Sequence, residues 1–154
     1  RKLMKKLSLY IFLVLMWCNF SNAETYDELE IRAIKKLQNE YLSCYAFYSI
    51  SESVFEDTED ESLKYIIEQK DSVLQNAMDI EFSLLALMGE ELLDDEKLFK
   101  EKIEPQLEEV FKQLWEQWQN DSEKSLVSER NKLCQEILNS PRPRIEYWIQ
   151  KLQK

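Results

Sequence analysis

The side chains of this sequence that could carry chemistry are carboxylates and cysteines, because the chain contains no histidine. That absence removes histidine-based triads and the Glu-x-x-His pairs of di-iron helical bundles. Asp79 and Glu81 stand two positions apart, and glycosidases work with two acids in one cleft. Acids on a charged helix are more often a solvated face. We therefore expect no catalytic residue, no metal ligand and no cofactor, with a carboxylate-dependent envelope enzyme such as a glycan hydrolase as the alternative.

A second arrangement of acids has the length of a calcium-binding loop. Residues 57–68 begin and end with an acid, as the calcium loop of helical sensors often does. The sixth position, which needs glycine, is Ser62, and Ile66 is more typical of a helix than of a loop. The sequence therefore predicts a polar connection that enters a helix.

The first 23 residues follow the order of a secretory signal peptide. Four basic residues precede an apolar run over 7–18, and Ser21 and Ala23 then stand three and one positions before a cleavage point. We expect cleavage between Ala23 and Glu24. The expected location is outside the cytoplasm, either periplasmic or extracellular, with no stable membrane anchor after cleavage.

Two other interpretations of this segment stay open. An uncleaved anchor would need about 20 apolar residues to span a bilayer, and this run is shorter. A lipid anchor would require acylation of Cys18. The bulky Trp17 stands directly before that cysteine, where lipoprotein signals usually carry a small residue.

Charge and cysteine content both change if residues 1–23 are removed. The full chain has 20 basic and 30 acidic residues, and the segment takes away four basic ones, so the net charge moves from −10 to −14. A protein with this net negative charge repels the phosphates of nucleic acids, so we expect no nucleic-acid partner. Two cysteines remain, Cys44 and Cys134. Disulfides persist outside the cytoplasm, so we expect these two to be bonded; two free thiols are the alternative.

The pattern of apolar residues predicts an all-α fold. Apolar side chains recur at steps of three and four, and one glycine and three prolines are the strong helix breakers. We expect a single domain over 24–154, an antiparallel bundle of about four helices plus a short C-terminal helix. The expected helices cover about 27–54 and 59–88, and a short final one covers 144–154. Between them we expect a third helix that is capped by Asp94 or Asp95 and carries Phe99 to Trp118. A fourth is expected from a cap at Asp121 or Ser122 to the prolines that follow Ser140. Pro105 predicts either a kink in the third helix or a helix that begins there after a turn.

Large aromatic residues near the C-terminal end provide a candidate binding surface, formed by Trp115, Trp118, Tyr147 and Trp148. Helix-spaced aromatics most often pack in a core, but tryptophan and tyrosine also form the hot spots of interfaces. The expected function is therefore a non-enzymatic exported module that binds an unknown protein or a small apolar ligand.

Overall fold

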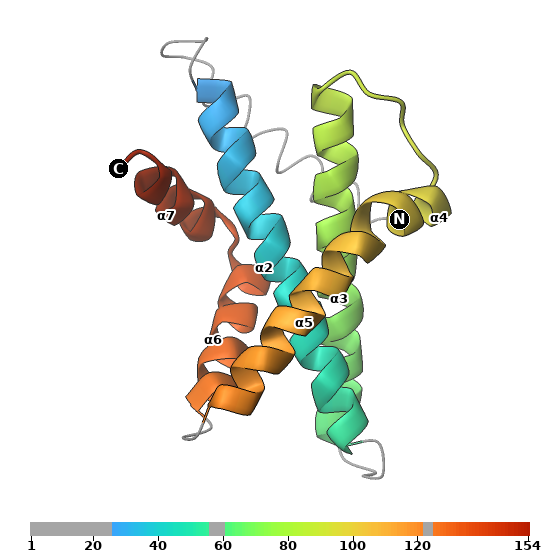
Figure 1. The fold of residues 1–154 in the computed structure, drawn as a ribbon, viewed down its shortest axis with the longest axis vertical. Coiled ribbons are helices and arrows are strands. Elements are labelled where there is room, and N and C mark those ends of the chain that lie inside the picture. The colour runs from blue at the N-terminus through green and yellow to red at the C-terminus, as the bar shows by residue number, and fades with distance from the viewer. Residues whose placement is uncertain (1–25, 56–60, 122–124) are drawn as a thin grey trace.

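A computed structural model describes residues 26–55, 61–121 and 125–154 (Figure 1). The described chain is all-helical, which confirms the predicted fold class, and five of its helices are longer than two turns. The elements are α2 (Tyr26–Phe55), α3 (Glu61–Leu87), α4 (Asp95–Leu98), the π-helical turn η2 (Phe99–Ile103), α5 (Glu104–Asn120), α6 (Ser125–Asn139) and α7 (Arg142–Leu152).

Helix α2 is the centre of the arrangement. It packs against α3, α5, α6 and α7. In Figure 1, α3 returns antiparallel to α2, α5 crosses α2 obliquely, and α6 and α7 lie along the remaining side. The middle of α2 is therefore buried around most of its circumference, from Glu40 to Tyr48, rather than along a single stripe. A helix that is covered on several sides needs apolar residues on several faces, and this stretch supplies them.

The core joins the predicted apolar faces of all the long helices. Its members from α2 include Ile34, Leu37 and Tyr41, and small Ala33 and Ala46 allow neighbouring helices to approach closely. The other helices contribute the following buried side chains: Val73, Ala77, Ile80, Leu84, Ile103, Leu107, Val110, Leu114, Cys134, Ile137 and Ile145.

A disulfide between Cys44 and Cys134 ties α2 to α6, as predicted. The two Cα atoms are 5.6 Å apart and the cysteines are 90 positions apart in sequence. Both residues are fully buried. The bond therefore fixes the C-terminal part of the chain to the central helix from inside the core.

Local signals in the sequence set the ends of α3 and α4. Gly89 has a φ of +68°, and the N–H groups of Gly89 and Glu90 donate to the carbonyls of Ala86 and Leu85. This is the Schellman pattern that ends many helices. The Asp94 side chain then accepts a hydrogen bond from the Lys97 backbone N–H at 2.9 Å and caps α4.

Pro105 is accommodated by a widened turn. The helix that begins at Asp95 continues through η2 into α5, and within η2 the Glu104 N–H reaches back five residues to the Phe99 carbonyl. A proline ring clashes with the carbonyl four residues earlier and offers that carbonyl no N–H. The π-helical turn absorbs this conflict and bends the helix, which is the kinked interpretation rather than a helix that begins at Pro105.

A tyrosine of α2 donates a hydrogen bond to a backbone carbonyl in the last turn of α6. The Ile137 carbonyl lacks a helical donor. The residue four positions later, which would normally donate its N–H, is Pro141, and proline has no N–H. The Tyr41 hydroxyl donates to this carbonyl at 3.0 Å, and both residues are buried. Burial also raises the pKa of Tyr41 well above its usual range. The contact links the middle of α2 to the turn between α6 and α7.

The predicted signal segment, including Ala23, Glu24 and Cys18, lies outside the described residues. Within the described ranges, no helix is long and apolar enough to cross a membrane. Residues 61–68 of the segment compared with a calcium loop belong to α3.

Candidate ligand-binding groove

The first half of α2 carries a polar stripe opposite its core face. Arg32, Lys35, Lys36 and Asn39 are exposed and follow the i, i+3, i+4, i+7 spacing of one helix face. Helices α3 and α5 diverge from α7 around this stretch of α2 (Figure 1). Residues of α3, α5 and α7 line the same hollow as this stripe, so the stripe forms the floor of that hollow.

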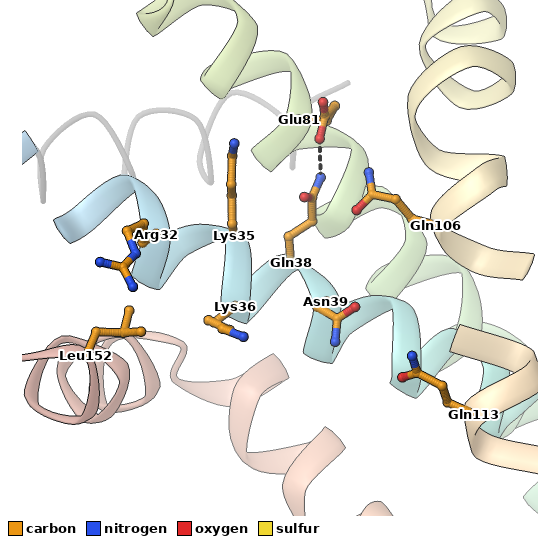
Figure 2. A pocket seen from close by; sticks show the side chains of 9 residues that line it. All are labelled: Arg32, Lys35, Lys36, Gln38, Asn39, Glu81, Gln106, Gln113 and Leu152. Atoms are coloured by element: carbon orange, nitrogen blue, oxygen red, sulfur yellow. Dashed lines mark hydrogen bonds between the residues drawn. The ribbon is translucent and has the colours of Figure 1, made fainter. Parts of the chain in front are cut away.

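A groove of about 810 Å³ lies over this floor (Figure 2). Glu81 of α3, Gln106 and Gln113 of α5, and Leu152 of α7 line its sides. The volume lies in the range of about 300–1,000 Å³ that is common for small-molecule sites. Such sites are usually mostly apolar, whereas this lining consists of three cations, four amides, one carboxylate and one leucine.

A buried glutamine holds the carboxylate of the groove. Gln38 is only 2% exposed, and its amide nitrogen donates to the Ala77 carbonyl at 3.2 Å and to a Glu81 carboxylate oxygen at 2.6 Å. Figure 2 shows this bond across the gap between α2 and α3. A charge-assisted bond of this length fixes the acceptor. Glu81 is therefore positioned at the wall and already engaged.

The cations on the floor are not engaged in the same way. Arg32, Lys35 and Lys36 form no ion pair with another described residue, although the described part of the chain contains several ion pairs elsewhere. Lys36 lies 5.6 Å from the ring centroid of Trp148, which is a cation–π distance. The groove therefore keeps a surplus of positive charge on a protein whose net charge is −10.

The side-chain amides of Gln106 and Gln113 each donate a hydrogen bond to a residue four positions earlier. The Gln106 nitrogen donates to the Lys102 carbonyl at 2.6 Å, and the Gln113 nitrogen donates to a Glu109 carboxylate oxygen at 2.8 Å. Each of these bonds uses a donor of the amide, which leaves its oxygen as an acceptor. Gln106 also directly follows the bend at Pro105, so the π-helical turn sets where it stands.

Two of the four aromatic residues predicted as a binding surface lie next to the groove. Tyr147 and Trp148 of α7 pack edge to face with centroids 5.2 Å apart. Arg144 stacks over Tyr147 at 4.2 Å and bonds Glu40 of α2 through both carboxylate oxygens, with distances of 2.6–2.9 Å. The bidentate bond and this ring stack fix α7 beside α2.

Trp115 and Trp118 belong to a different part of the molecule. They lie near the C-terminal end of α5, which Figure 1 shows well apart from α7. Trp115 is 53% exposed because it falls one position after the buried Leu114. Trp118 is partly buried. The structure therefore divides the four predicted residues into two separate pairs.

Asp79 and Glu81 do not converge on one cleft. Glu81 lines the groove, whereas Asp79 is 6% exposed and accepts a hydrogen bond from the Gln75 amide at 3.0 Å. Burial raises the pKa of Asp79 above its usual value, and the nearby charge of Asp95 raises it further. The described lining of the groove thus presents a single carboxylate. Across the described residues, no group of three acids or cysteines is arranged to hold a metal ion.

A shallower hollow of about 500 Å³ lies between α3 and the α4–α5 bend. Met78 and Phe99 supply its apolar part, and Asp95, Glu96 and Glu104 are the acids at its edge. It differs from the groove in both charge and polarity. An anion would meet repulsion there, whereas the groove offers attraction.

Comparison with known families, characterised proteins and solved structures gives no match to this chain. The function must therefore be inferred from the groove and surfaces themselves. The sequence prediction missed the groove residues apart from Glu81, which it considered as one of a pair of acids. The available signal was the helical spacing of Arg32, Lys35, Lys36 and Asn39, three cations and an amide on one face in an acidic chain.

Proposed function

We propose that this protein is an exported, non-enzymatic binding protein and that the groove over α2 is its ligand site. The observation that carries the proposal is a set of amide groups and of cations without an ion pair to any described residue, gathered around one hollow. These groups donate and accept hydrogen bonds, and the described lining holds a single carboxylate rather than a pair of acids. The polar lining supports a polar ligand rather than the small apolar ligand expected from the aromatic residues.

The alternative of a carboxylate-dependent glycan hydrolase requires two acids at roughly 5–10 Å from one another across a cleft. Glu81 is bonded to Gln38, and Asp79 is buried with Gln75, so the two acids have separate partners. This geometry favours binding over hydrolysis. Release of reducing ends from an envelope glycan, lost in Glu81→Gln, would support the hydrolase instead.

Export is part of the proposal and is supported by the order of residues 1–23 and by the disulfide between Cys44 and Cys134. The test is to express the whole chain in a bacterial host and a eukaryotic secretory host, then recover the protein from the exported fractions. An intact mass that begins at Glu24 is expected. Retention of the full chain in the cytoplasm of both hosts would contradict export.

Ligand binding is tested on the same material by native mass spectrometry, which detects small molecules that remain bound to the intact protein. A bound species that is lost in Lys35→Glu and retained in Lys132→Glu is expected. Lys132 is an exposed cation on α6 outside the groove, so it is a matched control. A species retained equally by both variants would show that the groove is not the site.

Binding of a protein partner is the second candidate, and the exposed Trp115 favours it. Among the described large apolar side chains, this indole has the highest exposed fraction, 53%. Exposed tryptophans are frequent hot spots. Trp115→Ala is expected to abolish capture of a partner from the exported fraction, while Tyr65→Ala, also an exposed aromatic, leaves it unchanged.

A further inference from the structure

We propose that the ligand of the groove is an acidic saccharide, a polyhydroxylated ring compound that carries carboxylate groups. This inference rests on the proposed binding function and names its ligand class. Three features of the lining carry it: cations that form no ion pair with a described residue, amide oxygens that can accept hydrogen bonds, and the size of the hollow.

The cations select a negative charge. Arg32, Lys35 and Lys36 stand on consecutive turns of α2, and no described acid pairs with them. The acid in the described lining, Glu81, projects from α3 and is held by Gln38 of α2 at 2.6 Å (Figure 2). A carboxylate in the groove would complete the charge balance that the fold leaves open.

The amides select hydroxyl groups beside that charge. Gln106 and Gln113 each use one amide N–H for a bond to a residue four positions earlier, so their amide oxygens can accept hydrogen bonds from a ligand. An inorganic anion without O–H groups, such as sulfate, or a simple carboxylate has no donors to give. Asn39 adds a further amide on the floor. Sugar hydroxyls donate and accept, and they match a wall of amide groups better than an apolar or purely anionic molecule does.

The dimensions favour more than a single ion. A volume of about 810 Å³ is far larger than one carboxylate or phosphate needs, and the groove is open along α2. Lys36 is held against Trp148, and Leu152 supplies an apolar edge on the same side. A short oligosaccharide would therefore span from the amides of α5 to the cations beside α7.

The test uses isothermal titration calorimetry on the full exported protein with three probes at low and high salt: a trimer of galacturonic acid, a neutral trisaccharide and inorganic sulfate. We expect the acidic trimer to bind at least about tenfold more tightly than either other probe, and binding to weaken with salt. The double variant Arg32→Gln/Lys35→Gln is expected to lose about tenfold or more in affinity. Lys132→Gln is expected to change it less than about twofold.

Each other outcome contradicts a defined part of the inference. Equal binding of the neutral trisaccharide would overturn selection by charge while the binding function stands. Equal binding of sulfate, which has no O–H groups, would overturn recognition of hydroxyls while the binding function stands. If no probe binds and native mass spectrometry also finds no ligand, the saccharide inference and the binding function both fail. Circular dichroism and thermal unfolding confirm that the variants remain folded.

Discussion

Two tyrosines on α2 provide a matched test of how the core is held together. Tyr41 and Tyr48 are each 1% exposed and stand two turns apart. The Tyr41 hydroxyl donates to the Ile137 carbonyl at 3.0 Å. The Tyr48 hydroxyl is buried with no hydrogen-bond partner in the described part of the chain. Replacing each by phenylalanine removes the same oxygen, so the difference between the variants reports the hydrogen bond.

The expected magnitudes follow from what each hydroxyl leaves behind. A buried acceptor that loses its partner costs about 1–3 kcal/mol. The Ile137 carbonyl cannot recover a helical donor because Pro141 has no N–H, so we expect Tyr41→Phe to lower the free energy of unfolding by about 2 kcal/mol. Tyr48→Phe removes a hydroxyl that was desolvated without compensation. We expect that variant to be unchanged or more stable by up to about 1 kcal/mol.

Urea unfolding of the disulfide-bonded protein, followed by circular dichroism, measures both variants against the unmodified chain. Equal slopes with urea would show that the unfolded states are comparable. A loss for Tyr48→Phe as large as that for Tyr41→Phe would refute the reasoning. It would mean that ring packing, and not the bond to the end of α6, sets the cost.

Three further perturbations test other parts of the fold. Reduction of the Cys44–Cys134 bond, which spans 90 positions, should lower the free energy of unfolding by up to ~4.6 kcal/mol in the chain-entropy model; an unchanged urea midpoint would oppose this. Burial raises the pKa of Asp79 above 3.8, its ordinary value, so the folded state loses stability as the pH rises past 3.8. Asp79→Asn removes this charge, so the variant should be more stable than the unmodified chain at neutral pH but not in acid. The exposed Asp71→Asn is the control, and a pH-independent difference would contradict the assignment. Gly89→Ala should lower the free energy of unfolding by about 1–2 kcal/mol in thermal unfolding because φ is +68°, although no atom lies within 4 Å of the added methyl group; no loss would show that the turn can rearrange.

Most of the secondary structure could be predicted from local signals in the sequence. The predicted helices over 27–54 and 59–88 agree with α2 and α3 within about two residues. The apolar spacing, Gly89 and the proline before α7 act within a few positions of themselves, so they can be read without knowing the fold. Pro105 was recognised as a disruption, but the widened turn depends on how the helix on either side packs.

Much less of the candidate site could be predicted from the sequence. The aromatic residues were selected by type, yet Trp115 and Tyr147 lie on separate helices that Figure 1 shows apart. The groove was missed because its floor comes from α2 and its walls come from α3, α5 and α7. Spacing shows that Lys35 and Asn39 share a face with Arg32, but it does not show that other helices rise on either side of that face.

The sequence by itself determined the helices and which face of each is apolar, and it predicted the disulfide partners that the structure confirms. These features follow from periodicity, from backbone preferences and from counting the cysteines that remain after residues 1–23. Only the tertiary structure shows that α2 is central and that the Tyr41 hydroxyl bonds a carbonyl at the end of α6. It also shows that Asp79 and Glu81 have different hydrogen-bond partners. A helical pattern fixes the direction of a side chain about its own axis. Only packing decides which atoms of another helix that side chain meets.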